Sequence, residues 1–209
     1  MPDFSFEKSL NVSTLIVGLD EAGRGPWCGP VVAACVGWPN LQCPDDLAHQ
    51  INDSKKLTAQ KREQLYDKII QTTPIWGIGQ ASAKEIDEIN ILQASFLAMR
   101  RALDQVIKKG FHPNIALIDG NRLPDWEIEK HALIGGDGKS LSIAAASILA
   151  KVTRDRIMMK LAQKYPYYGW EKNAGYGTKA HQQGLAKYGI TPEHRRSYAP
   201  IQKILKKAI

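Results

Sequence analysis

Cysteine is scarce in this sequence, which has only three cysteines in 209 residues. Cys28, Cys35 and Cys43 are odd in number and lack the CxxC spacing typical of a zinc site. Neither a disulfide framework nor a structural zinc site is therefore indicated. We expect Cys28 and Cys35 to act as small apolar fillers of the core.

Long apolar runs are also missing. No stretch approaches the roughly 20 residues that a membrane-spanning helix requires. The first 30 residues lack the charged-then-apolar order of a signal peptide. Hydrophobic residues make up 44% of the chain, which is enough for one ordinary core. We therefore expect a cytoplasmic protein with one domain over residues 1–209.

Acidic residues are few near the C-terminus. Residues 139–209 hold 14 Lys and Arg against 3 Asp and Glu, whereas residues 1–138 hold 14 against 18. From Pro166 onward, aromatic residues interleave with the cations. Cations that meet phosphates and rings that stack on bases are common on nucleic-acid-binding surfaces, although a solvated basic face or helix packing would use the same residues.

The stretch from Leu15 to Val36 organises the rest of the chain. An apolar run ends on Asp20 and Glu21, and a second apolar run begins at Val31. Short β-branched runs bounded by Gly and Pro predict two buried strands joined by a tight turn. The two acids are therefore expected at a strand end.

Two adjacent carboxylates at the end of a buried strand repel each other and lose solvation. An acidic surface turn is the ordinary reading of such a pair. A divalent cation would remove the conflict, and carboxylate oxygens suit Mg²⁺ or Mn²⁺. Gly23 and Gly25 flank Arg24 and would let the backbone approach a ligand that a Cβ would block.

The arrangement of a buried strand ending on a carboxylate occurs a second time. Residues 115–118 form a short apolar run that ends on Asp119, after a strongly amphipathic pattern that predicts a helix over residues 86–109. A strand–helix–strand succession normally places its strands side by side in parallel. Asp119 is therefore expected close to Asp20.

A fourth acid, Asp137, lies in a Gly-rich turn before a predicted helix over residues 140–165, where it could equally be a structural cap.

Lys55 and Lys56 precede a helix that Thr58 is expected to cap, and they could meet a phosphate or face solvent. Other predicted elements are a lead-in without pattern over residues 1–13, a loop over 39–52, strands over 75–81 and 131–134, and short helices over 179–188 and 200–208.

Six ordered motifs give the chain a family resemblance. They are DEAGRGP at 20–26, DSKKL at 53–57, LIDGN at 117–121, GD at 136–137, AAASILAKVTRD at 144–155 and GYGT at 175–178. Together, over about residues 14–207, they resemble bacterial ribonuclease HII, the type 2 ribonucleases H. Trp27 and Cys28 differ slightly from the residues expected after Pro26.

This resemblance implies a ribonuclease H-like α/β fold, with a central five-stranded mixed sheet flanked by helices. The core would span about residues 14–165, and a helical C-terminal region, about 166–209, would contribute to substrate binding. The implied activity is hydrolysis of the RNA strand of RNA–DNA hybrids and nicking of duplex DNA on the 5′ side of an embedded ribonucleotide. The ends would be 5′-phosphate and 3′-hydroxyl.

The resemblance also implies roles for individual residues. Two divalent ions, Mg²⁺ or Mn²⁺, would be held by Asp20, Glu21, Asp119 and Asp137. Gly23, Arg24 and Gly25 would read the ribose 2′-hydroxyl through the backbone, and Tyr176 would pack on the neighbouring deoxyribose. Lys55 is a further candidate substrate contact. We expect a monomer, and the residues do not indicate whether a replication clamp is a partner.

Two other functions remain open at this stage. A non-catalytic RNA-binding module would also use the basic, aromatic C-terminal part, but it leaves four acids at strand and helix ends unexplained. A metal nuclease of the same fold that acts on DNA, such as a junction resolvase or an exonuclease, would use the acids but ignore a single ribonucleotide.

Overall fold

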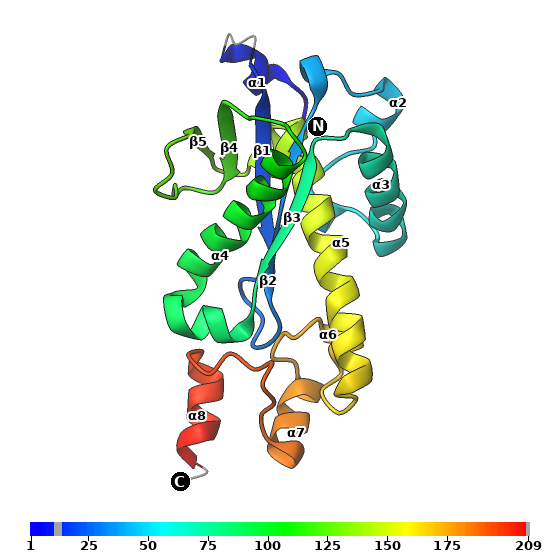
Figure 1. The fold of residues 1–209 in the computed structure, drawn as a ribbon. Helices are drawn as coiled ribbons and strands as arrows, with labels where there is room; N and C mark the ends of the chain where they lie inside the picture. Colours follow the sequence, from blue (N-terminus) through cyan, green and yellow to red (C-terminus); the bar gives the residue numbers. More distant parts are fainter. Residues whose placement is uncertain (11–13, 208–209) are drawn as a thin grey trace.

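A five-stranded sheet forms the centre of the computed structural model, which describes residues 1–10 and 14–207 (Figure 1). The strand order is β3-β2-β1-β4-β5. The strands are β1 (Ile16–Ala22), β2 (Val31–Gly37), β3 (Trp76–Ala81), β4 (Ile115–Asp119) and β5 (Glu129–Leu133). β1 pairs antiparallel with β2 and parallel with β4, so the predicted mixed five-stranded sheet is confirmed.

Two long helices cover the two faces of the sheet. Helix α4 (Ala83–Lys108) packs its apolar side on one face, against Val17 and Leu19 of β1. Helix α5 (Leu141–Lys164) covers the other face, where a Cβ on Gly18 would lie 2.3 Å from the backbone nitrogen of Ile143. Only glycine at this position lets α5 approach β1 so closely.

Side-chain caps fix where the long helices begin. Ser82 and Glu85 form a capping box at the start of α4, three residues before the predicted start. Thr58 caps α3 (Ala59–Thr72), as predicted, and Ser140 caps α5. Because Ser82 and Glu85 satisfy free amide groups at the helix start, α4 begins before the apolar pattern from which its start was predicted.

Some local predictions were wrong. An eight-residue loop, residues 23–30, joins β1 to β2 in place of a tight turn. The segment predicted as a loop over residues 39–52 contains η1 (Pro39–Leu41) and α2 (Asp45–Ala48). Another short helix, η2 (Ser54–Lys56), lies before α3. None of the described helices has the length and apolarity needed to cross a bilayer.

The N-terminal residues are ordered against the start of α5. Helix α1 (Ser5–Ser9) follows Asp3, whose backbone bonds to Lys139 at 3.2 Å and to Leu141 at 2.9 Å. The buried carboxylate of Glu7 accepts a 2.7 Å hydrogen bond from the Ser140 hydroxyl. The predicted irregular lead-in is therefore wrong for α1, and residues 11–13 lie outside the described part of the chain.

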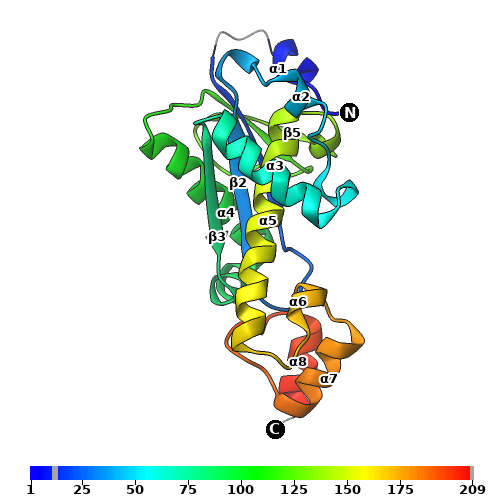
Figure 2. The ribbon, with the colours of Figure 1, turned by 90° about the vertical axis from the view of Figure 1, so that its right-hand side faces the viewer.

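Three helices follow the end of α5: α6 (Trp170–Asn173), α7 (Lys179–Tyr188) and α8 (Ala199–Lys207). Figure 2 shows them together beyond the last turn of α5. Trp170 stacks on Tyr168 and both rings are buried, so these aromatics pack helices together. Tyr167, Tyr176 and Tyr188 remain about half exposed.

Candidate metal centre and recognition loop

Three of the predicted acids converge near the carboxyl ends of two inner strands of the sheet. Asp20 lies in β1, Asp119 ends β4, and Asp137 lies in the short helix η3 (Gly136–Gly138). One carboxylate oxygen from each residue lies within 4.8 Å of those from the other two. These residues are far apart in the sequence, and the fold brings them together.

Strand pairing explains why Asp20 and Asp119 meet. β1 and β4 are parallel with Leu19 opposite Ile118, so the following residues are neighbours at the same edge. Asp20 lies on the same face of β1 as Gly18, which is the face that α5 covers. The predicted proximity of the two aspartates is confirmed.

A hydrogen bond ties the third acid to the second. The backbone amide of Gly136 donates to Asp119 Oδ1 at 2.7 Å, which fixes the turn that carries Asp137. A Cβ on Gly136 would lie 3.3 Å from the same oxygen and 2.6 Å from the Ile143 side chain. A larger residue at this position would therefore displace the turn.

Glu21 is not part of this group of three. Successive strand residues point to opposite faces of a sheet, so Glu21 alternates with Asp20. The Glu21 carboxylate pairs with Arg24 at 3.2 Å. Its role as a fourth ligand stays a prediction. The alternation of side chains along a strand is a signal that could have separated these two neighbouring acids from the sequence alone.

Burial and mutual repulsion make this cluster costly without a cation. Burial, followed by the nearby charges of Glu21 and Asp119, raises the pKa of Asp20 well above its ordinary range. Burial and the charge of Asp119 likewise raise the pKa of Asp137. Closely spaced, desolvated carboxylate oxygens are the donor set that a hard divalent cation requires, so these residues fit such an ion.

Lys55 lies beside the cluster. Its ammonium nitrogen is 3.7 Å from Asp137 Oδ2, and its side chain is 79% exposed. Lys55 therefore offsets part of the negative charge and leaves most of its side chain open to solvent. The neighbouring residue Ser54 is buried, and its hydroxyl lies 2.8 Å from that of Ser147 on α5. Sequence reasoning did not identify this serine pair.

Asp155 has a structural explanation. Its carboxylate pairs with Lys151, four residues earlier on α5, at 2.7 Å and with Arg62 at 3.8 Å. The contact with Arg62 joins α5 to α3.

The loop over residues 23–30 begins directly after β1, and we call it the recognition loop after the role that the family resemblance implies for it. Gly23 has a φ angle of +98°, and a Cβ there would lie 2.0 Å from the Arg154 side chain. Glycine is therefore required at this position by both conformation and space. A Cβ on Gly25 would meet only the ring of Tyr176, at 3.4 Å.

Tyr176 thus lies next to the recognition loop and is about half exposed. The His181 ring, through Nδ1, is 3.0 Å from the backbone carbonyl of Tyr176. Trp27 in the loop donates its backbone amide to Gly175 at 2.9 Å. The structure therefore brings Tyr176 next to Gly25, in the same loop as Gly23 and Arg24, although Tyr176 is about 150 residues away from them in the sequence.

The basic C-terminal stretch is only partly available for phosphate contacts. Arg196 is exposed, but Arg195 is fully buried and donates to carbonyl oxygens of the recognition loop. The general expectation that the cations of this stretch meet phosphate is therefore wrong for Arg195. The sequence gives no local signal that separates these adjacent arginines.

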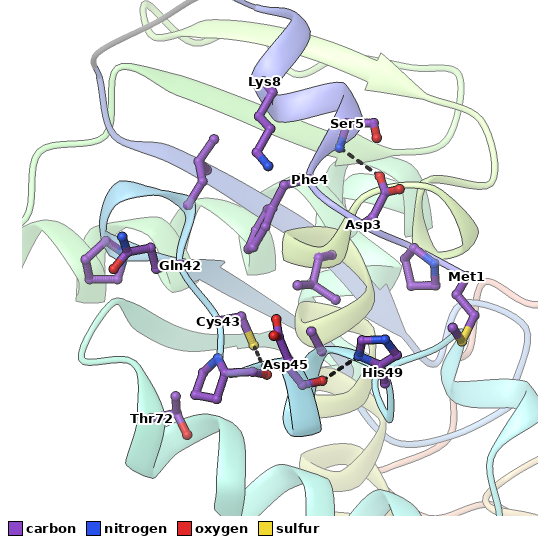
Figure 3. Close-up of a pocket in the computed structure, with 16 residues that line it drawn as sticks. Met1, Asp3, Phe4, Ser5, Lys8, Gln42, Cys43, Asp45, His49 and Thr72 are labelled. Carbon is purple, nitrogen blue, oxygen red and sulfur yellow. Dashed lines mark hydrogen bonds between the residues drawn. The ribbon is translucent and has the colours of Figure 1, made fainter.

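A pocket with a volume of about 1140 Å³ lies elsewhere, between the N-terminal residues and α2 (Figure 3). The described residues that line it include none of the predicted site residues. Its polar contacts are local, such as the 2.7 Å hydrogen bond from the Ser5 amide to Asp3. It therefore plays no part in the candidate site.

Comparison with known proteins identifies similar chains. The sequence pattern of the family described as Ribonuclease HII matches residues 17–201. The Ribonuclease HII of Paramagnetospirillum magneticum is 49% identical over 205 residues, covering 98% of this chain and 99% of that protein.

Several solved structures share the fold. The ribonuclease H2 of Pyrococcus horikoshii superposes with a TM-score of 0.74 at 29% identity, covering 92% of this chain and 98% of that one. The ribonuclease HII of Archaeoglobus fulgidus, solved in complex with PCNA, has a TM-score of 0.69 at 25% identity, covering 88% and 95%.

Proposed function

The chain belongs to the ribonuclease HII family, and from this premise we propose that it nicks duplex DNA on the 5′ side of an embedded ribonucleotide and hydrolyses the RNA strand of RNA–DNA hybrids. It is an endonuclease of the ribonuclease H class. The proposed products carry 5′-phosphate and 3′-hydroxyl ends.

One observation carries this proposal. A cluster of three carboxylates and a glycine-lined loop lie at the same end of β1, where Asp20 is separated from Gly23 by two residues. The cluster suits a metal-dependent attack on a phosphate, and the loop suits recognition of a neighbouring sugar. A DNA nuclease would have no use for the second feature.

Asp20, Asp119 and Asp137, with Glu21 beside them, are the proposed holders of two divalent ions, Mg²⁺ or Mn²⁺. When bound, such ions activate a water molecule and stabilise charge on the leaving 3′-oxygen. The carboxylates offset the ionic charge in a site that burial keeps poorly solvated. Lys55, with its exposed side chain beside Asp137, would meet the phosphate backbone.

Gly23, Arg24 and Gly25 are proposed to recognise the ribose. No acceptor among the described residues takes a hydrogen bond from their backbone amides. Amide donors at an exposed turn can bind the 2′-hydroxyl, the group that distinguishes RNA from DNA. Because the proposed nucleophile is water, this hydroxyl stays intact and serves only for recognition. The exposed ring of Tyr176 would pack on the adjacent deoxyribose.

We further propose that residues 1–209 act as one monomeric domain in the cytoplasm, where chromosomal DNA would be the source of substrate. The exposed cations of residues 166–209 would hold the duplex beyond the cleavage point.

The test is nicking of a DNA duplex with one embedded ribonucleotide, with products mapped at nucleotide resolution. We expect one nick, 5′ of the ribonucleotide, with Mg²⁺ or Mn²⁺ and none after EDTA treatment. An all-DNA duplex of the same sequence is the control. Equal cleavage of both duplexes would indicate a DNA nuclease, and binding without cleavage under any metal condition would indicate an RNA-binding module.

A further inference from the structure

Two buried arginines lie directly behind the recognition loop. Arg154 on α5 and Arg195 before α8 are 1% and 0% exposed. Within residues 1–10 and 14–207, neither side chain lies within ion-pair distance of a carboxylate. Burying an unpaired cation is costly, so other contacts must offset the lost hydration.

Backbone carbonyl groups supply the contacts of Arg195. Its guanidinium donates to the carbonyl of Gly23 at 2.6 Å, to that of Arg24 at 2.9 Å and to that of Gly29 at 2.9 and 3.0 Å. It also donates to the Tyr198 hydroxyl at 3.0 Å, and this hydroxyl donates in turn to the Arg24 carbonyl. One side chain therefore binds both ends of the recognition loop.

Arg154 approaches the same loop from α5. It donates to the carbonyls of Cys28 at 3.3 Å, Pro30 at 3.1 Å and Ala174 at 3.0 Å. Ala174 is two residues before Tyr176, so Arg154 joins the loop to the segment that carries the exposed tyrosine. The close approach of its side chain to Gly23 is also what excludes a Cβ there.

These contacts determine where the loop amides point. In a trans peptide unit the C=O and the N–H point in opposite directions. The carbonyls of Gly23 and Arg24 point toward Arg195, so the amides of the residues that follow them, Arg24 and Gly25, point away from it. Both residues are exposed, and their amides have no acceptor among the described residues.

We propose that Arg195 and Arg154 are positioning residues for ribonucleotide recognition: by holding the loop carbonyls inward, they present the amides of Arg24 and Gly25 to the substrate. This inference rests on the proposed reading of the 2′-hydroxyl by the loop. Neither arginine touches the substrate, and both act through the backbone that does.

Replacing Arg195 with lysine tests whether the hydrogen-bonding geometry of the guanidinium, and not only its charge, holds the loop. An ammonium group cannot span three carbonyls and a hydroxyl, although it keeps the charge. Arg195→Lys and Arg195→Gln are therefore compared with Tyr198→Phe, which removes only the supporting hydroxyl and should not affect folding. Arg156→Gln is the matched control, because Arg156 lies on α5 two residues from Arg154 and pairs outward with Glu63.

Hydrogen exchange reports the loop independently of any activity. The amides of Trp27 and Gly29 donate to Gly175 and Glu193, both at 2.9 Å. In both Arg195 variants we expect these two amides to exchange about tenfold faster while amides of α4 keep their rates, and in Tyr198→Phe a smaller acceleration. If the exchange rates of the loop amides and of the α4 amides rose by the same factor, the proposal would be overturned, because such a result would mean a general loss of stability.

Binding without cleavage reports recognition. In EDTA, the ratio of the Kd for an all-DNA duplex to the Kd for the same duplex with one ribonucleotide measures the preference for ribose. We expect this Kd ratio to fall about fivefold or more in the Arg195 variants and to stay unchanged in Arg156→Gln. An unchanged ratio would overturn the proposal. A wild-type ratio near one would instead reject the reading of the 2′-hydroxyl, whatever the exchange data show.

Discussion

Asp119 accepts a 2.7 Å hydrogen bond from the backbone amide of Gly136, the residue before Asp137. One carboxylate therefore belongs to the candidate metal site and also fixes the turn that supplies another of its acids. Loss of the charge on Asp119 and loss of its acceptor oxygen should consequently have separable effects.

Asp119→Asn should remove cleavage while the fold remains intact. The amide oxygen of Asn can still accept from Gly136, but it carries no charge for a divalent ion. We expect the nicking rate to fall by at least about 100-fold, which corresponds to roughly 2.7 kcal/mol of barrier. Asp104→Asn, which changes an exposed carboxylate on α4, is the control. Activity of Asp119→Asn within tenfold of wild type would argue against the site.

Asp20→Asn should stabilise the metal-free protein. The pKa of Asp20 is raised, so the folded state loses stability as pH rises through that pKa, and at neutral pH the charged form is disfavoured. We expect the free energy of unfolding without metal to rise by about 1 kcal/mol. Mg²⁺ should raise the Tm of the wild type and leave that of the variant nearly unchanged. A variant that is less stable without metal would show that Asp20 is structural.

Tyr176→Ala should reduce nicking more than it reduces stability. Tyr176 is 51% exposed next to Gly25, so little core packing is lost with its ring. We expect cleavage at a single ribonucleotide to fall about tenfold or more, and the free energy of unfolding to fall by less than about 1 kcal/mol. Tyr176→Phe should retain most activity because it keeps the ring. Parallel losses of activity and stability would make Tyr176 a packing residue.

Acid should destabilise the protein through His194. Burial, and then the neighbouring His181, lowers the pKa of His194 from 6.5 to about 4. Its Nδ1 accepts a 2.9 Å hydrogen bond from the Thr191 amide, so protonation would break that contact. Between these pH values only the unfolded state binds the proton, and stability therefore falls as pH decreases from 6.5 to about 4.

The size of this effect is up to about 3 kcal/mol, with no further loss from His194 below pH 4. Chemical denaturation at pH 7 and at pH 4.5 measures it. In His194→Gln the difference between the two pH values should shrink. A difference equal to that of the wild type would mean that other groups cause the acid sensitivity.

Salt should weaken substrate binding through the exposed cations only. We expect affinity for a hybrid duplex to fall at least about tenfold between 50 and 200 mM salt. Arg196→Gln should reduce the slope of log affinity against log salt by about one. Arg195→Gln should leave the slope unchanged because its guanidinium is buried. A flat salt profile for the wild type would exclude phosphate contacts by this region.

Much of the site was predictable because it depends on strand ends. Short apolar runs predicted β1 and β4, and Asp20 and Asp119 were expected close together, which the parallel pairing of these two strands produces. Asp137 was predicted to lie in a turn before a long helix, where it could equally be a cap, and only the family resemblance implied that it belongs to the site. The strand and turn predictions use periodicity and short-range order, which can be read directly from a sequence.

Contacts over long sequence separations could not be predicted in the same way. Arg195 and Arg196 have the same chemistry and nearly the same neighbours in the chain, yet one is buried and the other exposed. What decides between them is a set of carbonyl groups about 170 residues earlier. Likewise, Glu7 lies in a segment without periodic pattern, and the donors to its buried carboxylate, the Ser140 hydroxyl and the Ser142 amide, lie more than 130 residues later in the chain.

The N-terminal pairing of Asp3 with residues 139 and 141 has a practical consequence for handling the protein. An affinity tag joined ahead of Met1 would adjoin a backbone that borders the turn of Asp137, whereas a tag at the carboxyl end would follow α8, which lies at the opposite end of the molecule from α1 (Figure 1). Assays of metal dependence are therefore best made with the tag at the carboxyl end or removed.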